Sequence, residues 1–294
     1  MLLSPGRYLA ILLFSFSASL FASDKQYTVT SSDGVELAVQ ESGSPQGKPI
    51  IFIHGLLGSH LNWEKQRQDP ALQRFRLISF DMRGHGLSAK PTQAEAYREG
   101  SRWAEDVAAV IDASDAKKPL LVGWSLGGAV ISHYLAQFGD KSLSGALYID
   151  AVVELTPEQI PAHPQVYQAM TSADLATHLD GEREFLRLCF YQQPDEVTFA
   201  RLQANAAMAS WEMQRAVPSM KVTLEQGLGK ATIPVRFIYG RHDQLVDPQA
   251  SLARARSVNP HVSTVWFDHS GHAPFLEEPA RFNQQLADFA DSLH

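Results

Sequence analysis

The sequence is poor in cysteine and in metal-binding patterns. Cys189 is the single cysteine, so no intramolecular disulfide can form, and we expect a small buried apolar residue rather than a catalytic thiol. The histidines include no H-E-x-x-H motif, and His269 and His272 have no cysteine or carboxylate partner at a usual metal-ligand spacing. The sequence therefore predicts no metal site.

Runs of basic residues are also missing. The chain has 25 Lys and Arg against 32 Asp and Glu, which gives a formal net charge of −7, and it has no stripe that combines aromatic and basic residues. This composition argues against nucleic acid as a partner. With 294 residues, the chain suits one α/β domain that carries an insertion.

Long hydrophobic runs are missing apart from a short one near the N-terminus. Arg7 precedes an apolar run from Tyr8 to Phe21, and the polar chain begins after Ala22. The run is shorter than the roughly 20 residues that cross a bilayer, and its layout is typical of a secretory signal peptide. We expect cleavage near Ala22, export to the periplasm or the medium, and no stable membrane insertion afterwards. An uncleaved anchor is the alternative.

The remaining chain alternates between strand and helix patterns. Two alternating segments, Tyr27–Ser31 and Val35–Gln40, flank Asp33-Gly34, which is a hairpin turn signal. Later runs are continuously apolar, as in parallel strands that are buried on both faces. They are Pro49–Ile53, Arg76–Phe80, Pro119–Val122, Leu143–Ile149, Val235–Tyr239 and Val262–Phe267. Helical patterns lie between them, so the sequence predicts the α/β class, with a mostly parallel twisted sheet and helices on both faces.

The interval 151–229 interrupts this alternation. It is rich in Ala, Gln, Glu, Met and aromatic residues, and its prolines divide it into several short helical segments. We interpret it as a helical lid, or cap, between two strands. The predicted organisation is a signal peptide at 1–22, an α/β core at 23–150 and 230–294, and the lid at 151–229.

A Gly-x-Ser-x-Gly turn places Ser125 between a buried strand and a helix. Leu120 to Val122 precede the turn, and an apolar helical segment follows it from Ala129. A nucleophilic serine must project out of the regular backbone above the sheet, and the flanking glycines permit the tight turn and the close packing of the helix. The pentapeptide alone is weak evidence, but this context predicts that Ser125 is the nucleophile.

Such a serine needs a base and a group that orients the base. His272 lies in the loop after the last predicted strand, where open α/β sheets place their sites. The rival is His269, which we interpret as a loop histidine. Asp243 follows the preceding strand and is predicted to orient the imidazole, and Asp150 at another strand end is the second candidate acid.

The loops after two other strands offer supporting groups. The backbone N–H groups of Leu56 and Leu126 are predicted to form an oxyanion hole. His54, just before Leu56, is interpreted as a packed histidine. The segment Asp81–Ser88 combines charges and glycines, and we expect it to stabilise a loop beside the site.

Together these blocks resemble the α/β-hydrolase superfamily over nearly the whole chain after the signal peptide, in particular its compact esterase, lactonase and perhydrolase-like members. The blocks are His54-Gly55, Asp81–Ser88, Gly123–Gly128, Gly240–Asp243 and Ser270–His272. The resemblance implies a Ser125, Asp243 and His272 triad that needs no cofactor. The serine at the turn differs from the aspartate of the dehalogenase and epoxide-hydrolase branches. The turn also resembles that of cytoplasmic esterases acting on carrier-protein-bound pimeloyl esters, a substrate from which export would separate this chain.

The predicted function is hydrolysis of carboxylic esters through an acyl-enzyme. The partner would be a small-molecule ester or lactone, and a lactonase or a C–C bond hydrolase with the same triad is the alternative. A small-molecule receptor of the same fold is a further alternative. Because the lid should cover Ser125, we expect small to medium apolar substrates, with Trp211 among the residues that select the chain length.

Overall fold

One mixed sheet organises the protein. The computed structural model describes residues 24–293, and in this range eight strands form a sheet in the order β1-β2-β4-β3-β5-β6-β7-β8. The strands are β1 (Lys25–Thr30), β2 (Glu36–Gly43), β3 (Pro49–Ile53), β4 (Arg76–Phe80), β5 (Leu120–Trp124), β6 (Gly145–Ile149), β7 (Val235–Gly240) and β8 (Ser263–Phe267). The predicted signal peptide lies outside the described residues.

The strand predictions are confirmed, with ends that differ by at most three residues. β1 and β2 form the predicted antiparallel hairpin, and Gly34 in its turn has a φ of 85° that suits glycine. β2 pairs antiparallel with β4, while β3 to β8 are parallel. All five residues of both β5 and β6 are buried, as expected for parallel strands with helices on both faces.

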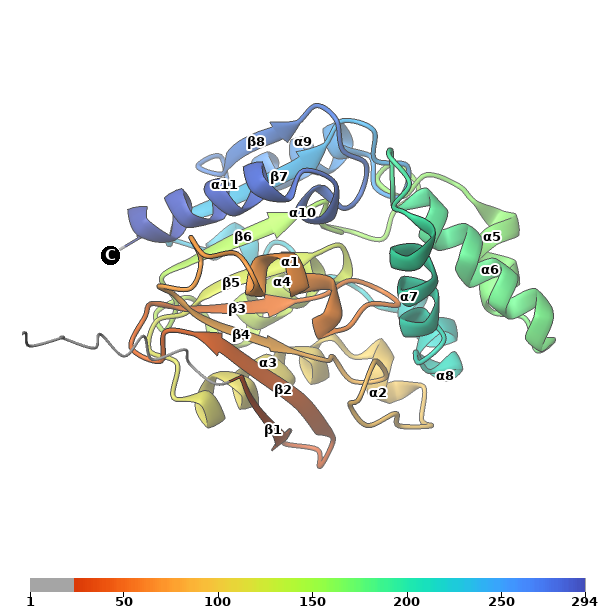
Figure 1. Cartoon of the computed structure of the whole chain (residues 1–294), viewed down its shortest axis with the longest axis horizontal. Helices are drawn as coiled ribbons and strands as arrows, with labels where there is room; N and C mark the ends of the chain where they lie inside the picture. Colours follow the sequence, from red (N-terminus) through yellow and green to blue (C-terminus); the bar gives the residue numbers. More distant parts are fainter. Residues whose placement is uncertain (1–23, 294) are drawn as a thin grey trace, which may run out of the picture.

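Helices cover both faces of the sheet (Figure 1). The longest helix of one layer is α3 (Gly100–Ser114), which packs on α4 (Leu126–Phe138), and α9 (Pro248–Val258) packs on β7 in the same layer. In the other layer, α11 (Pro279–Ser292) contacts the short helices α1 (Glu64–Arg67) and α10 (Pro274–Glu277). The α/β class and the layered arrangement are thus as predicted. In the described part of the chain, no helix is both long enough and apolar enough to span a bilayer.

The segment between β6 and β7 contributes four α-helices that gather beyond the carboxyl ends of the parallel strands (Figure 1). They are α5 (Pro164–Met170), α6 (Leu175–Leu188), α7 (Glu196–Ala206) and α8 (Trp211–Ala216). Asp174, Asp195 and Ser210 cap the N-termini of α6, α7 and α8 by accepting a backbone N–H bond. We refer to residues 151–229 as the lid segment. Its status as a separate unit stays a prediction.

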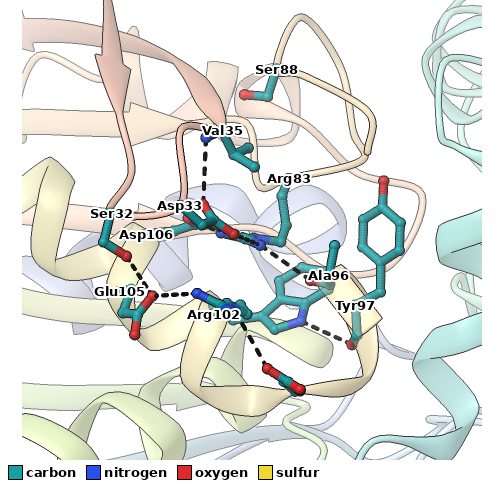
Figure 2. Close-up of polar contacts among 12 residues, drawn as sticks. Ser32, Asp33, Val35, Arg83, Ser88, Ala96, Tyr97, Arg102, Glu105 and Asp106 are labelled. Carbon is teal, nitrogen blue, oxygen red and sulfur yellow. Dashed lines mark hydrogen bonds and ion pairs between the residues drawn. The ribbon is translucent and has the colours of Figure 1, made fainter. Parts of the chain in front are cut away.

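A buried guanidinium stabilises the loop after β4 (Figure 2). Arg83 is fully buried, and its guanidinium donates to Asp106 of α3 at 2.6 and 2.7 Å and to Asp33 of the hairpin turn at 2.9 and 3.2 Å. A further bond reaches the carbonyl oxygen of Ala96 in α2 (Glu95–Arg98). The Arg83 side chain therefore joins β4, the first hairpin and α3 at one point.

We predict that Arg83→Met lowers the free energy of unfolding by about 3–5 kcal/mol, because it leaves the buried Asp106 carboxylate without its cation. Arg102→Met is the matched control, since Arg102 pairs with Glu99 and Glu105 at the surface (Figure 2). That variant should lose less than about 1 kcal/mol. Urea unfolding followed by circular dichroism measures both. Equal losses in the two variants would contradict this account of the buried ion pairs.

Candidate active site

Ser125 occupies a strained turn between β5 and α4. Its φ of 53° and ψ of −116° are unfavourable for a residue with a side chain, and surrounding bonds hold this conformation. The Ser125 N–H donates to the Ile149 carbonyl at 2.9 Å, and the Ser125 carbonyl accepts from Val152 N–H at 3.0 Å. The turn is therefore tied to the end of the neighbouring strand β6.

Two glycines allow this turn to pack against its surroundings. A Cβ atom on Gly123 would lie 2.5 Å from the Gly127 carbonyl oxygen, and one on Gly127 would lie 2.4 Å from the Ile53 carbonyl oxygen. Either contact would force backbone to move. The glycines that the sequence places around Ser125 are thus required for the close approach of α4 to β3 and β5.

His272 and Asp243 meet at the same edge of the sheet, from the loops that follow β8 and β7. His272 Nδ1 lies 2.8 Å from Asp243 Oδ2, and both side chains are almost fully buried. Since an ionised carboxylate only accepts hydrogen bonds, Nδ1 carries the proton and Nε2 is left as an acceptor. His272 Nε2 has no hydrogen-bond partner among residues 24–293, so it is free to take a proton from a reacting group.

The backbone N–H and the backbone carbonyl of His272 both form hydrogen bonds to distant residues. No sequence signal indicated either bond. The His272 N–H donates to the Cys189 carbonyl at 2.9 Å, and its carbonyl accepts from Trp124 Nε1 at 2.6 Å. Trp124 directly precedes Ser125, while Cys189 follows α6 of the lid segment. Both the serine turn and the lid segment therefore fix the position of the imidazole.

Glu277 of α10 bonds the lid segment to the same loop. Its carboxylate accepts from the backbone N–H groups of Tyr191 and Gln192 at 2.9 Å and from Gly271 N–H at 2.8 Å. A glutamate at that position gave no local sequence signal, because its partners lie far away in the chain or in a loop. Its three bonds join the bend after α6 of the lid segment to the His272 loop.

The rival residues from the sequence lie elsewhere or make other contacts. His269 is exposed, and its backbone N–H donates to Glu278. His54 is fully buried, with Nδ1 on the Gly55 carbonyl and Nε2 accepting from Met82 N–H, and burial lowers its pKa to about 4. Asp150 accepts from Gly240 N–H at 2.8 Å, whereas it is Asp243 that contacts the His272 ring nitrogen.

Two backbone N–H groups are available beside Ser125. Leu126 is the first residue of α4, so its N–H lacks a partner within the helix. Leu56 lies in the loop after β3, and both leucines line the same cavity as Ser125. Within residues 24–293, no acceptor is found for either N–H group. This is the donor pair expected for an oxyanion hole, and its role stays a prediction.

A cavity of about 450 Å³ opens above Ser125. Among the described residues, its wall contains no Asp, Glu, Lys, Arg or His side chain. The lid segment supplies most of the wall, including Ile160, Tyr167, Phe185 and Val217, while Leu245 and Val246 follow the Asp243 loop. Apolar cavities of this size are typical of sites for small molecules.

The expected role of Trp211 is corrected. Trp211 does not line the cavity, because its ring stacks on His178 of α6 with 4.0 Å between the ring centroids. Cys189 is buried as predicted, and its Sγ approaches the Phe185 carbonyl. Phe185 and Gln214, which lie on α6 and α8, face the cavity. Helical spacing alone could not distinguish these lid residues from those that pack within the lid.

Among the described residues, one group of three side chains could hold a metal ion. It consists of Asp150, Asp243 and His272, whose possible ligand atoms all lie within 4.8 Å of one another. However, His272 Nδ1 and Asp243 Oδ2 already share a hydrogen bond at 2.8 Å. A nitrogen that carries this proton has no lone pair for a cation. The contact fits an oriented base better than a metal ligand set.

Comparisons with known proteins give the family of the chain. The family model described as "alpha/beta hydrolase fold" matches residues 48–279. A structure from Burkholderia cenocepacia that is assigned as an aryl esterase is 61% identical, with a TM-score of 0.90, and the match covers 91% of this chain and 98% of that one. The esterase RhEst1 from Rhodococcus sp. ECU1013 is 27% identical, with a TM-score of 0.80, and the match covers 92% and 99% of the two chains. A non-heme haloperoxidase of Rhodococcus erythropolis is 34% identical over 90% of this chain and 99% of its own.

We predict that a fluorophosphonate probe labels the wild-type protein and that Ser125→Ala abolishes labelling without loss of fold. His272→Ala should slow labelling by several orders of magnitude, because the hydroxyl loses its base. His269→Ala is the matched control and should label at about the wild-type rate, since that side chain is exposed. Mass spectrometry of the labelled peptide measures all three. Rapid labelling of Ser125→Ala would show that another residue is the nucleophile.

Proposed function

Because the chain belongs to the α/β-hydrolase family, we propose that it is a serine hydrolase that cleaves carboxylic esters through an acyl-enzyme intermediate. The observation that carries this proposal is the position of Ser125, which stands in a strained turn at the wall of an apolar cavity. The turn is bonded through Trp124 to the histidine that would act as its base. The relatives named as esterases support the reaction class.

In the proposed mechanism, His272 Nε2 removes the Ser125 proton while Oγ attacks the ester carbonyl carbon. The negative charge on the carbonyl oxygen is stabilised by the N–H groups of Leu56 and Leu126, each worth about 3 kcal/mol of the barrier. His272 then gives its proton to the departing alcohol. Water, activated by the same nitrogen, hydrolyses the acyl-enzyme and restores Ser125. Asp243 holds the Nδ1–H and stabilises the imidazolium in both half-reactions.

The cavity favours neutral apolar substrates of limited size. Without a charged side chain in its wall, a carboxylate or ammonium group of the substrate would be desolvated without a partner. Tyr167 and Phe185 offer aromatic surface, and the 61% identical protein is assigned as an aryl esterase. We therefore propose esters of short to medium acyl chains, with aryl esters among them. Lactones are cyclic esters, so the same groups can open them.

We predict that acyl chains of about two to eight carbons are cleaved with higher kcat/KM than a chain of sixteen, because the cavity encloses a limited volume. Phe185→Ala removes a ring from the cavity wall and should move the optimum to longer chains. Trp211→Ala is the control and should leave the ranking unchanged, since Trp211 lies outside the wall. A series of nitrophenyl esters gives the ratio of kcat/KM between acyl-chain lengths for each protein. This ratio does not depend on the fraction of active enzyme. An effect of Trp211→Ala equal to that of Phe185→Ala would contradict this assignment of the wall.

We also propose that the protein is exported, on the support of the apolar run that ends near Ala22. Mature protein from the native host should then begin at Ser23 or within about two residues of it. Intact-mass measurement and N-terminal sequencing test this. Protein that retains Met1 in the cytoplasmic fraction would contradict export and would favour a cytoplasmic ester as the substrate.

A further inference from the structure

Asp150 is a buried carboxyl group that the proposed mechanism does not use. It directly follows β6, at the strand end bonded to the Ser125 turn, and its side chain is fully buried. Its φ of 40° lies in the left-handed region, which aspartate and asparagine tolerate better than most residues. A residue in this conformation and without solvent contact is held there by its surroundings.

The two oxygens of Asp150 are in different situations. Oδ1 accepts the backbone N–H of Gly240 at 2.8 Å. Oδ2 is buried, and no group among residues 24–293 donates a hydrogen bond to it. An ionised carboxylate with an unsolvated oxygen of this kind is costly, whereas a protonated carboxyl group would itself be a donor at Oδ2.

Asp243 offers the contrasting case at the same place. Its Oδ1 accepts the backbone N–H groups of Leu245 and Val246 at 2.8 and 3.1 Å, and its Oδ2 accepts from His272. Both oxygens of Asp243 therefore have hydrogen-bond donors. Asp150 has one donor, and one carboxyl oxygen of Asp150, one of Asp243 and one ring nitrogen of His272 lie within 4.8 Å of one another.

The other titratable groups near Asp150 do not supply a compensating charge. Tyr239 of β7 is fully buried, and the carboxyl group of Glu277 on α10 adds negative charge. No Lys or Arg forms an ion pair with Asp150 in the described part of the chain. Burial, and then the charge of Asp243, raise the pKa of Asp150 well above its ordinary value.

We propose that Asp150 is a positioning residue that holds a proton at neutral pH and donates it in a hydrogen bond to Asp243. The pair then carries one negative charge rather than two, and Asp243 keeps its orientation toward His272. The proposal rests on the proposed function only in that Asp243 orients the catalytic base. Its protonation state can be measured without any substrate.

Asp150→Asn is the decisive variant, because its amide can donate to Asp243, can accept from Gly240 N–H and tolerates the left-handed backbone. Difference infrared spectra of wild type minus Asp150→Asn at pH 7 should contain the carbonyl band of a protonated carboxylic acid. Absence of that band, with a carboxylate band in its place, would overturn the proposal. Should Asp150→Asn fail to fold, the difference spectrum of wild type minus Asp150→Gly decides the matter, because that variant removes the same carboxyl group and leaves Glu277 in place.

The stability of the same pair of proteins gives an independent readout. Folding raises the pKa of the Asp150 carboxyl group, so the folded protein binds more protons than the unfolded chain does. The stability of the wild type therefore falls as the pH rises above the pKa that Asp150 has in the unfolded chain. Asparagine lacks this linkage. The melting temperature of Asp150→Asn relative to wild type should therefore increase between pH 4 and pH 7. A decrease over this window would mean that Asp150 is ionised and stabilised by its surroundings.

The positioning role is tested by the pH profile of kcat/KM, whose acid limb reports the ionisation of the essential base. Asp150→Asn should leave the midpoint of this limb unchanged, because it replaces one neutral group by another. If Asp150 were ionised in the wild type, the substitution would remove a negative charge near His272 and move the midpoint to lower pH. Asp150→Gly is compatible with the left-handed backbone at this position but removes the proposed hydrogen-bond donor to Asp243. It should lower kcat/KM by about tenfold and move the acid limb to higher pH. A purely structural role predicts that Asp150→Gly lowers stability alone, with no movement of the limb. If Ser125→Ala kept its activity, the proposed function would fail while the infrared result would still stand.

Discussion

The strained backbone at Ser125 is the constraint on which the site depends. A residue with a φ of 53° and a ψ of −116° holds that conformation only when bonds on several sides fix it. These bonds come from Ile149 and Val152, at the end of β6 and in the start of the lid segment. The position of Ser125 at the cavity wall, the start of α4 and the departure of the lid segment from the sheet are therefore parts of one arrangement.

The same arrangement connects the lid segment to the loop that carries His272. His272 is bonded through its N–H to Cys189 and through its carbonyl to Trp124. Glu277 adds bonds from α10 to the lid segment. Movement of the segment around residue 189 would therefore shift the imidazole, and a change of lid sequence would alter both the substrate wall and the position of the base.

The sequence was sufficient to predict the parts whose signals are local. Continuous apolar runs predicted the buried parallel strands, and the strand, turn and helix around Ser125 predicted the nucleophile turn. Asp243 and His272 could be proposed because both follow a strand at the same edge of the sheet. The bond from Trp124 to His272 spans 148 positions and leaves no periodic pattern. The contacts of the lid also depend on how separate helices pack together. Helical spacing therefore could not show that Phe185 faces the cavity while Trp211 stacks on His178.

Burial explains why the site holds so few charges. Burial lowers the pKa of His54 to about 4 and that of His85 to about 3, so both imidazoles around the loops after β3 and β4 are neutral at pH 7. The cavity wall adds no charge. In such surroundings, an imidazolium that forms at His272 is stabilised mainly by the carboxylate of Asp243 at 2.8 Å. The interaction is strong because little water is present to screen the two charges. One carboxylate neutralises one imidazolium, whereas a second ionised carboxylate would hold the proton on the base and slow its transfer to the departing alcohol. A site built to move a single proton in an apolar cavity therefore works best with a single counter-charge.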